Sequence, residues 1–174
     1  MQYLLAIDGS TKNTGWAIFK DSKLEDYGCI SASSTDVIKR IQKMVEGIYQ
    51  IIKKYPIDKI VIEEVRPDNT GYGVGNQHTQ KVLMWLQAAF VFLFHEECPK
   101  VEIEYMYPSE WRKICGIKNG RGIKRDSAKS ADILFVKETF GIEVNDDAAD
   151  AIGIGYAAIN KNRVNIPSAG YFGL

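Results

Sequence analysis

Short apolar runs alternate along this chain with longer segments in which apolar residues recur every three or four positions. Continuous apolar runs predict buried strands, and the wider spacing predicts helices with a buried face. The strands are expected at 3–8, 15–19, 24–30, 59–65 and 101–107. The helices are expected at about 35–55, 78–96, 109–114, 126–140 and 146–155.

The order of these segments predicts an α/β fold. The first three strands are joined by short polar links, which favours antiparallel hairpins, and strands then alternate with helices. We therefore expect a single domain over 1–174, with a mixed five-stranded sheet covered by helices on both faces and an irregular tail from about 161. Ser34 or Thr35, Ser109 and Asn145 are expected to cap helices.

Composition narrows the class of protein without naming a function. The chain has 22 basic and 22 acidic residues, so its net charge does not indicate a nucleic-acid partner. Three cysteines without CxxC spacing argue against a disulfide framework or a zinc site, and for a reducing compartment such as the cytoplasm. No signal peptide follows Met1, and the run 82–94 is too short to span a membrane, so no membrane partner is expected.

Acidic residues recur where predicted strands end. Asp8 closes the first strand and Glu63 lies near the end of the fourth, while Asp147 and Asp150 lie three residues apart on one helical face. Each has a simpler explanation: Asp8 can start a turn, Glu63 can sit at a solvated strand end, and Asp147 can complement a helix dipole.

Asp150 is the acid that is hardest to explain structurally. It lies in a run of alanine, glycine and isoleucine suited to close packing on a sheet, and no Lys or Arg lies within a helical turn of it. Four carboxylates without matched cations repel one another unless a divalent metal is bound, and oxygen-only ligands favour Mg²⁺ or Mn²⁺. Two such ions in one site suit in-line phosphoryl transfer.

Basic residues gather between 112 and 129, where seven Lys or Arg stand against one acid, Asp126. A run of this kind is usually a solvated face, but this one follows a strand expected near the acidic cluster. We therefore expect contacts to DNA phosphates. The candidate residues are Arg112, Lys113, Lys118, Arg121 and Arg125.

The segment 78–96 predicts a helix that is apolar around most of its circumference. Such a helix must bury more than one face. Either neighbouring helices of the same chain cover both faces, or a second copy covers one of them, and the homodimer is the favoured alternative.

The segments 5–15, 61–65 and 147–151, with the sequences LAIDGSTKNTG, VIEEV and DAADA, resemble the RuvC family of Holliday-junction resolvases. The resemblance runs in order from Asp8 to about Ala158. It implies a ribonuclease H-like fold and a dimeric, structure-selective endonuclease. It also implies that Asp8, Glu63, Asp147 and Asp150 are the metal-binding catalytic residues. The segment 108–112, which ends in Arg112, and the later Lys124 resemble the family's basic positions near the scissile phosphate.

The sequence departs from this family after the strand-four glutamate. Arg66 stands where better-studied members of the family have an aromatic residue that probes the junction centre. Tyr72, in the glycine-rich loop that follows, is a candidate for stacking on bases instead. We therefore expect cleavage of forks and flaps as well as Holliday junctions. The small size and the composition are compatible with a bacteriophage protein acting in an infected host cell.

Two other functions stay open at this point. The Asp8–Gly15 turn also resembles the phosphate-binding hairpin of sugar kinases and actin-like ATPases, but 174 residues leave no room for their second lobe. The second alternative is a non-catalytic nucleic-acid-binding module on the same fold. The presence of all four carboxylates argues against it.

Overall fold

The computed structural model describes residues 2–65, 74–118 and 125–161. Five strands form one sheet in the order β3-β2-β1-β4-β5. They are β1 (Tyr3–Asp8), β2 (Asn13–Lys20), β3 (Lys23–Ser31), β4 (Lys59–Glu63) and β5 (Glu102–Met106). β2 pairs antiparallel with both β1 and β3, and β4 pairs parallel with β1 and β5. The predicted mixed sheet with three antiparallel first strands is confirmed.

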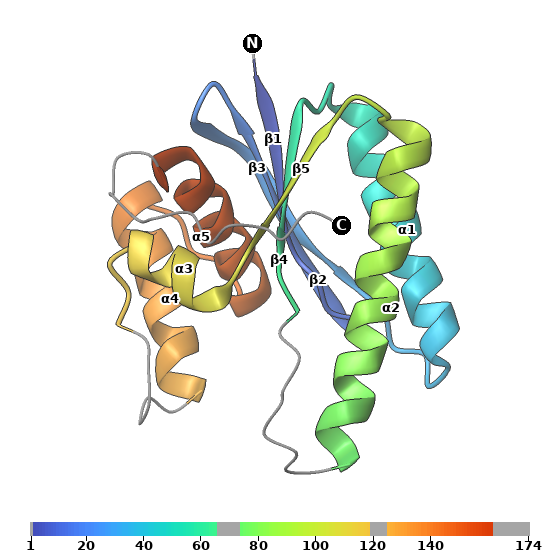
Figure 1. Cartoon of the computed structure of the whole chain (residues 1–174). Coiled ribbons are helices and arrows are strands. Elements are labelled where there is room, and N and C mark those ends of the chain that lie inside the picture. The colour runs from blue at the N-terminus through green and yellow to red at the C-terminus, as the bar shows by residue number, and fades with distance from the viewer. Residues whose placement is uncertain (1, 66–73, 119–124, 162–174) are drawn as a thin grey trace.

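Helices cover both faces of this sheet (Figure 1). The first layer consists of α1 (Val37–Lys54) and α2 (Val74–Glu97). The second layer consists of α3 (Pro108–Ile114), α4 (Arg125–Phe140) and α5 (Asp146–Asn160). In the described ranges no helix has the length and apolarity needed to cross a membrane. Cys29, Cys98 and Cys115 are free thiols.

Side-chain alternation along the strands creates a separate core under each layer. Leu5 and Ile7 of β1 point into the core shared with α1 and α2. Leu4 and Ala6 point into the core shared with α3, α4 and α5. Because side chains alternate along a strand, the next position of β1, Asp8, lies on the α5 face.

Two glycines allow α5 to lie very close to the sheet. A Cβ atom on Gly15 of β2 would lie 1.8 Å from the carbonyl oxygen of Asp147. A Cβ atom on Gly155 of α5 would lie 2.2 Å from the ring of Phe19. Neither position accepts a larger residue without a shift of its neighbours, and the close contact at Gly15 places the first turn of α5 directly against β2.

Several predicted helix and strand ends were wrong. α2 begins at Val74 instead of about residue 78, and α5 continues to Asn160 instead of 155. The N-cap of α1 is Asp36, whose side chain accepts hydrogen bonds from the backbone N–H groups of Ile38 and Lys39, and not Ser34 or Thr35. Tyr107 precedes α3 without a side-chain cap, because Pro108 already presets the first helical turn. β4 ends at Glu63 instead of residue 65. Asn145 caps α5 as predicted, accepting from the Ala148 N–H at 3.0 Å.

Candidate active site

Four acids meet on the α5 face at one end of the sheet. Val61 of β4 belongs to the core under α5, so alternation directs Glu63 to the same face as Asp8. α5 adds Asp147 and Asp150 from its first turns, and its closest packing is against β2 and β1. All four acids are half-buried. The fold therefore brings together the four residues that the sequence predicted as one site.

Neighbouring side chains orient two of these carboxylates. The fully buried indole of Trp111 donates a hydrogen bond from Nε1 to Oε2 of Glu63 at 2.8 Å. The thiol of Cys29 on β3 lies 3.8 Å from Oδ2 of Asp147. Glu63 is thus held by α3, whereas the Cys29 thiol is a weak donor to Asp147. A carboxylate with a weak partner keeps its lone pairs available for a cation.

Arg112, expected near the scissile phosphate, instead lies among the acids and pairs with one of them. Its Nη2 lies 3.6 Å from Oδ2 of Asp150, and its guanidinium lies 4.3 Å from the centre of the Trp111 ring. The prediction that no cation matches this cluster was therefore wrong. Arg112 comes from α3, which is distant in sequence, so spacing within α5 could not indicate it.

Asp132 of α4 is a further member of the cluster that the sequence analysis missed. Arg112 donates to it from Nε at 3.1 Å and from Nη2 at 2.8 Å. Within the part of the chain that the structure describes, Asp132 is the one buried charged residue, with 1% of its surface exposed. The signal was present, because Asp132 lies one turn before buried Val136 on the inward stripe of its helix.

The electrostatics of the site disfavour negative charge. Burial raises the pKa of Asp8 well above its ordinary value, and the charges of Glu63 and Asp147 raise it further. Burial, together with the charges of Asp8 and Asp132, raises the pKa of Asp150 to about 9. The pKa values of Glu63 and Asp147 are also raised, chiefly by burial. Such clustered shifts are typical of functional sites.

The donor set suits a hard cation, although the side chains do not form a closed cage. Within the described residues, no three His, Cys, Asp or Glu side chains converge closely enough to hold a metal ion. Oδ1 of Asp150 is buried and has no hydrogen-bond partner among them. An unpaired buried carboxylate oxygen is costly, and a divalent ion would satisfy it. The carboxylate oxygens are therefore of the type that the predicted Mg²⁺ or Mn²⁺ binds.

The predicted DNA-binding residues are only partly described. Lys113 and Lys118 are exposed. Arg112 is held inside the protein by Asp132, as described above. Lys129, from the same basic run, forms an ion pair with Asp146. Arg66, Tyr72, Arg121, Lys124 and the side chain of Arg125 lie outside the described residues, so their roles stay predictions.

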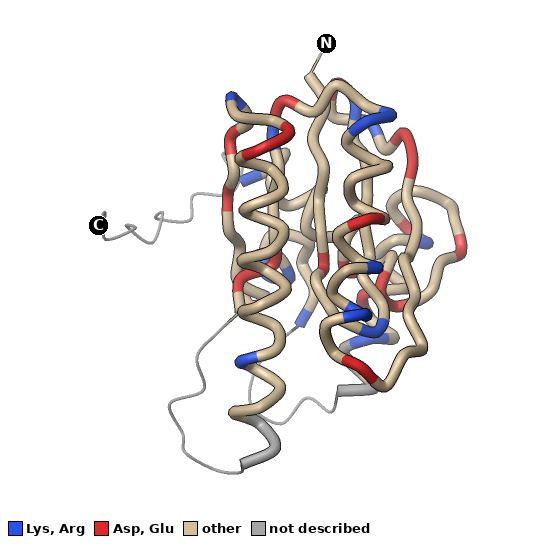
Figure 2. The backbone as a smooth tube through the Cα atoms, turned by 90° about the vertical axis from the view of Figure 1, so that its right-hand side faces the viewer, with Lys and Arg blue, Asp and Glu red and all other residues tan. Residues whose placement is uncertain are grey.

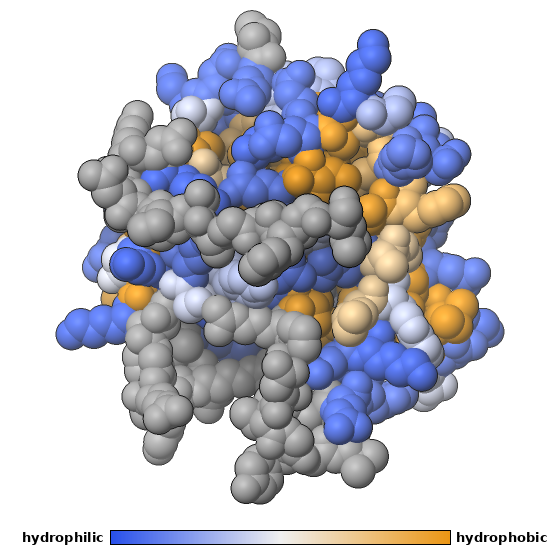
Figure 3. Space-filling view, in the orientation of Figure 1, coloured by the Kyte–Doolittle hydropathy of each residue, from blue (hydrophilic) through white to orange (hydrophobic). Residues whose placement is uncertain are grey.

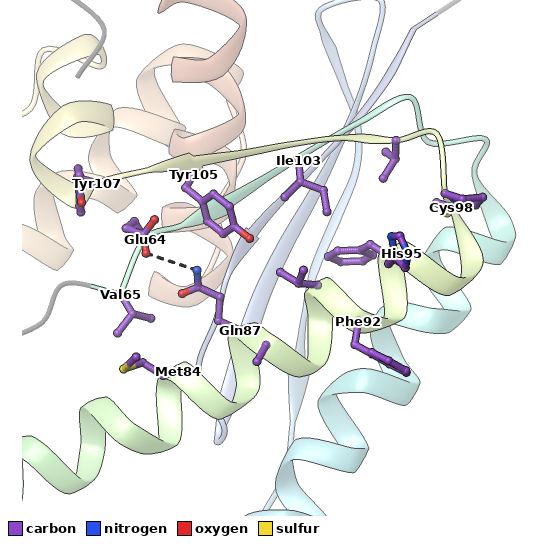
Figure 4. Close-up of a pocket in the computed structure, with 15 residues that line it drawn as sticks. Glu64, Val65, Met84, Gln87, Phe92, His95, Cys98, Ile103, Tyr105 and Tyr107 are labelled. Carbon is purple, nitrogen blue, oxygen red and sulfur yellow. Dashed lines mark hydrogen bonds between the residues drawn. The ribbon is translucent and has the colours of Figure 1, made fainter. Parts of the chain in front are cut away.

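The opposite face of the sheet carries a different feature, an apolar groove of about 780 Å³ between α2 and β5. Hydrophobic surface gathers there in Figure 3, and Figure 4 shows Phe92, His95 and Tyr105 along the groove. Glu64 also lines it, with an oxygen 3.4 Å from Nε2 of Gln87. Glu64 thus lies on the α2 side, away from the acidic site to which Glu63 belongs.

α2 carries apolar side chains on its outer surface as well. It has no Lys, Arg, Asp or Glu between Lys81 and Glu96 (Figure 2). Met84, Trp85 and Phe92 are 55%, 44% and 69% exposed. Other helices of the described chain therefore do not cover the whole circumference of α2.

Comparison with known proteins agrees with this geometry. A family model described as crossover junction endodeoxyribonuclease RuvC matches residues 4–69. The protein of that name from Vibrio vulnificus strain CMCP6 is 24% identical, over 98% of this chain and 94% of the relative.

Two solved structures share the fold. T. thermophilus RuvC in complex with a Holliday junction substrate superposes with a TM-score of 0.71 at 14% identity, over 94% of this chain and 96% of the other. The yeast mitochondrial Holliday junction resolvase Ydc2 gives a TM-score of 0.53 at 15% identity, over 90% of this chain and 77% of the other. The predicted resemblance to the RuvC family and its ribonuclease H-like fold is confirmed, and the comparisons support the predicted enzyme class, a crossover junction endodeoxyribonuclease.

Proposed function

We propose that this chain is a metal-dependent endonuclease that cleaves Holliday junctions and other branched DNA in the cytoplasm of a bacterial or phage-infected cell. The observation that carries the proposal is the meeting of four half-buried acids from β1, β4 and α5, with raised pKa values and an unpaired oxygen on Asp150. Its similarity to RuvC proteins supports DNA junctions as the substrate.

The four acids act together in this proposal. Asp8, Glu63, Asp147 and Asp150 would hold two Mg²⁺ or Mn²⁺ ions, which supply Lewis acidity for in-line attack of water on a backbone phosphate. The Trp111 indole fixes Glu63 through one oxygen and leaves the other for a cation. Lys124 is proposed to offset charge on the phosphate as the transition state forms.

Amide substitutions test the site directly. We expect Asp8→Asn and Asp150→Asn to lower the rate of Mg²⁺-dependent nicking by about a hundredfold or more, with DNA binding largely kept. Glu64→Gln is the matched control, because Glu64 is the adjacent acid on the groove side. Near wild-type cutting by both Asp variants would show that the acids are not the catalytic site.

We further propose a homodimer built on α2. Exposed Met84, Trp85 and Phe92 and the neighbouring apolar groove support it, because a monomer leaves this surface in water. A two-fold pairing would give two active sites for the two strands cut at a junction. Sedimentation that finds only a 19.6 kDa species at micromolar concentration would overturn the dimer. Phe92→Asp is expected to convert the dimer to monomer.

Arg66 is the basis for proposing that forks and flaps are cut as well as four-way junctions. A guanidinium can stack and contact phosphate at any strand exchange point, but it cannot act as an apolar wedge in the open centre of a junction. We expect comparable cutting of junction, fork and flap under one set of salt and Mg²⁺ conditions. Arg66→Phe should narrow the preference toward the four-way junction. Cutting by the wild type confined to that junction would contradict the proposal.

A further inference from the structure

Asp132 is a fifth carboxylate of the site, and it binds a cation instead of being open to one. Its two oxygens accept from Nε of Arg112 at 3.1 Å each, and Nη2 adds a bond of 2.8 Å. The Asp132 side chain has no exposed surface and that of Arg112 is 17% exposed. A two-pronged pair of this kind is charge-assisted and rigid, so it fixes where the arginine charge lies.

The pair holds Arg112 just short of Asp150. The distance from Nη2 to Oδ2 of Asp150 is 3.6 Å, longer than a hydrogen bond. The guanidinium also lies 4.3 Å from the centre of the Trp111 ring, and the Trp111 indole binds Glu63. Asp132 from α4 therefore positions an α3 segment that reaches two of the four proposed metal ligands.

Charge explains why this arrangement matters. A guanidinium free to bind Asp150 would neutralise it and would repel a divalent ion at the same place. With Asp132 present, the hydrogen-bonded carboxylate offsets most of the charge of Arg112, which keeps only a longer ion pair of 3.6 Å with Asp150. The four remaining carboxylates then carry the charge that two divalent ions balance. Oδ1 of Asp150 correspondingly has no partner within the described chain.

We propose that Asp132 is a positioning residue of the acidic site: it holds Arg112 by hydrogen bonds, beyond hydrogen-bond distance of Asp150, and offsets its charge, so that Asp150 stays open to a divalent cation. This inference rests on the proposed metal site. It differs from a direct phosphate contact by Arg112, because the partner of the arginine is inside the protein.

Calorimetric titration of the metal-free full chain with Mn²⁺ alone tests the inference. Asp132→Asn keeps the shape of the side chain and removes its charge, and we expect the affinity for Mn²⁺ to fall by about tenfold or more. The double variant Arg112→Gln with Asp132→Asn removes both charges and is expected to bind within about threefold of wild type. Glu143→Gln is the control. Glu143 also pairs with a cation of α4, Lys137, but its side chain is 82% exposed and lies outside the acidic site.

The outcomes separate this inference from the proposed function. Mn²⁺ binding that is equal in wild type and Asp132→Asn overturns the role of Asp132 alone. A loss that the double variant does not recover also overturns it, because Asp132 then only supports the fold. No Mn²⁺ binding by the wild type overturns the metal site, and this inference with it. If Asp132→Asn does not fold, the double variant decides: wild-type affinity supports the cancellation, and a tenfold loss contradicts it.

Discussion

The two faces of the central sheet are built from the same strands but bury different chemistry. Under α1 and α2 the core consists of aliphatic and aromatic side chains such as Leu5, Ile48 and Phe90. Under α3, α4 and α5 an apolar core continues into acids, a guanidinium and an indole that donates a hydrogen bond. Alternation along β1 and β4 separates these environments, because consecutive residues such as Ile7 and Asp8 point to opposite sides.

The two faces contribute to the stability of the folded chain with opposite signs. Burial of apolar surface under α1 and α2 is favourable without any ligand. On the α5 face the raised pKa values of Asp8 and Asp150 mean that the folded chain disfavours their charged forms. We therefore expect that smaller side chains in the core under α1 and α2 destabilise the fold. Removal of a carboxylate charge on the α5 face is expected to stabilise it.

The largest expected effect is on the apolar face. Phe90 has no exposed surface and stacks near Phe94, with ring centres 6.3 Å apart. Phe90→Ala leaves a cavity, and we expect the free energy of unfolding to fall by about 3–5 kcal/mol. Urea denaturation of wild type and variant measures this loss. Phe92→Ala on the outer side of α2 is the control at a protein concentration where the chain is monomeric, and it should change stability far less.

On the other face, Asp150→Asn should raise the free energy of unfolding, which is the opposite of the effect of Phe90→Ala. The carboxylate is costly in the metal-free protein because Oδ1 lacks a partner among the described residues and the neighbouring acids repel it. We expect unfolding in EDTA at pH 8 to require about 1–3 kcal/mol more in the variant. Cleavage should be lost at the same time, which separates stability from function.

Asp26→Asn is the matched control for this change. Asp26 accepts hydrogen bonds from Tyr55 and Lys54, and these bonds outweigh burial and lower its pKa. Its charged form is therefore favoured by folding, and we expect the variant to be less stable than wild type at pH 8. If Asp150→Asn were less stable than wild type in EDTA, the charge of Asp150 would not destabilise the metal-free protein, and this prediction would be wrong.

Dependence on pH gives a smaller but more specific contrast. A carboxyl with a raised pKa binds its proton more tightly in the folded state, so stability falls as pH rises from its unfolded pKa to its folded pKa. For Asp150, with a folded pKa of about 9, that window runs from about pH 4 to 9. We expect the melting temperature in EDTA to decline between about pH 5 and 9, and Asp150→Asn to flatten the decline. Saturating Mg²⁺ should flatten it in the wild type, because bound cations favour the charged form.

The sequence predicted the strands and the four acids because both follow from short patterns. Asp8 and Glu63 end apolar strands, and Asp147 and Asp150 share a helical face. A mixed sheet with three antiparallel first strands could then be inferred from the short links and from the alternation of strands and helices. The predicted end of β4 was less accurate, because apolar Val65 continues the pattern after the backbone has left the sheet.

The pairing of Arg112 with Asp132 could not be predicted in the same way. The two residues lie on separate helices, twenty positions apart, and their contact depends on how α3 and α4 pack beside α5. The basic run from 112 to 129 also mixes different roles. Arg112 and Lys129 pair with acids of the chain, whereas Lys113 and Lys118 are exposed, and only the folded structure separates them.

Substitution of an exposed lysine is expected to have the smallest effect, a modest loss of DNA affinity, and it tests whether α3 faces DNA. Lys113 is exposed next to Arg112, on the helix that positions Glu63. If it contacts a phosphate, Lys113→Ala should weaken binding to junction DNA by a few fold and lower the slope of log affinity against log salt by about one unit. Lys43→Ala is the control, because Lys43 lies on α1 at the other face, and its side chain is 57% exposed. Binding titrations from 50 to 200 mM salt, in Ca²⁺ or EDTA to prevent cutting, compare the slopes. Equal slopes for wild type, Lys113→Ala and Lys43→Ala would mean that Lys113 is part of a solvated surface, and that DNA reaches the acids from another side.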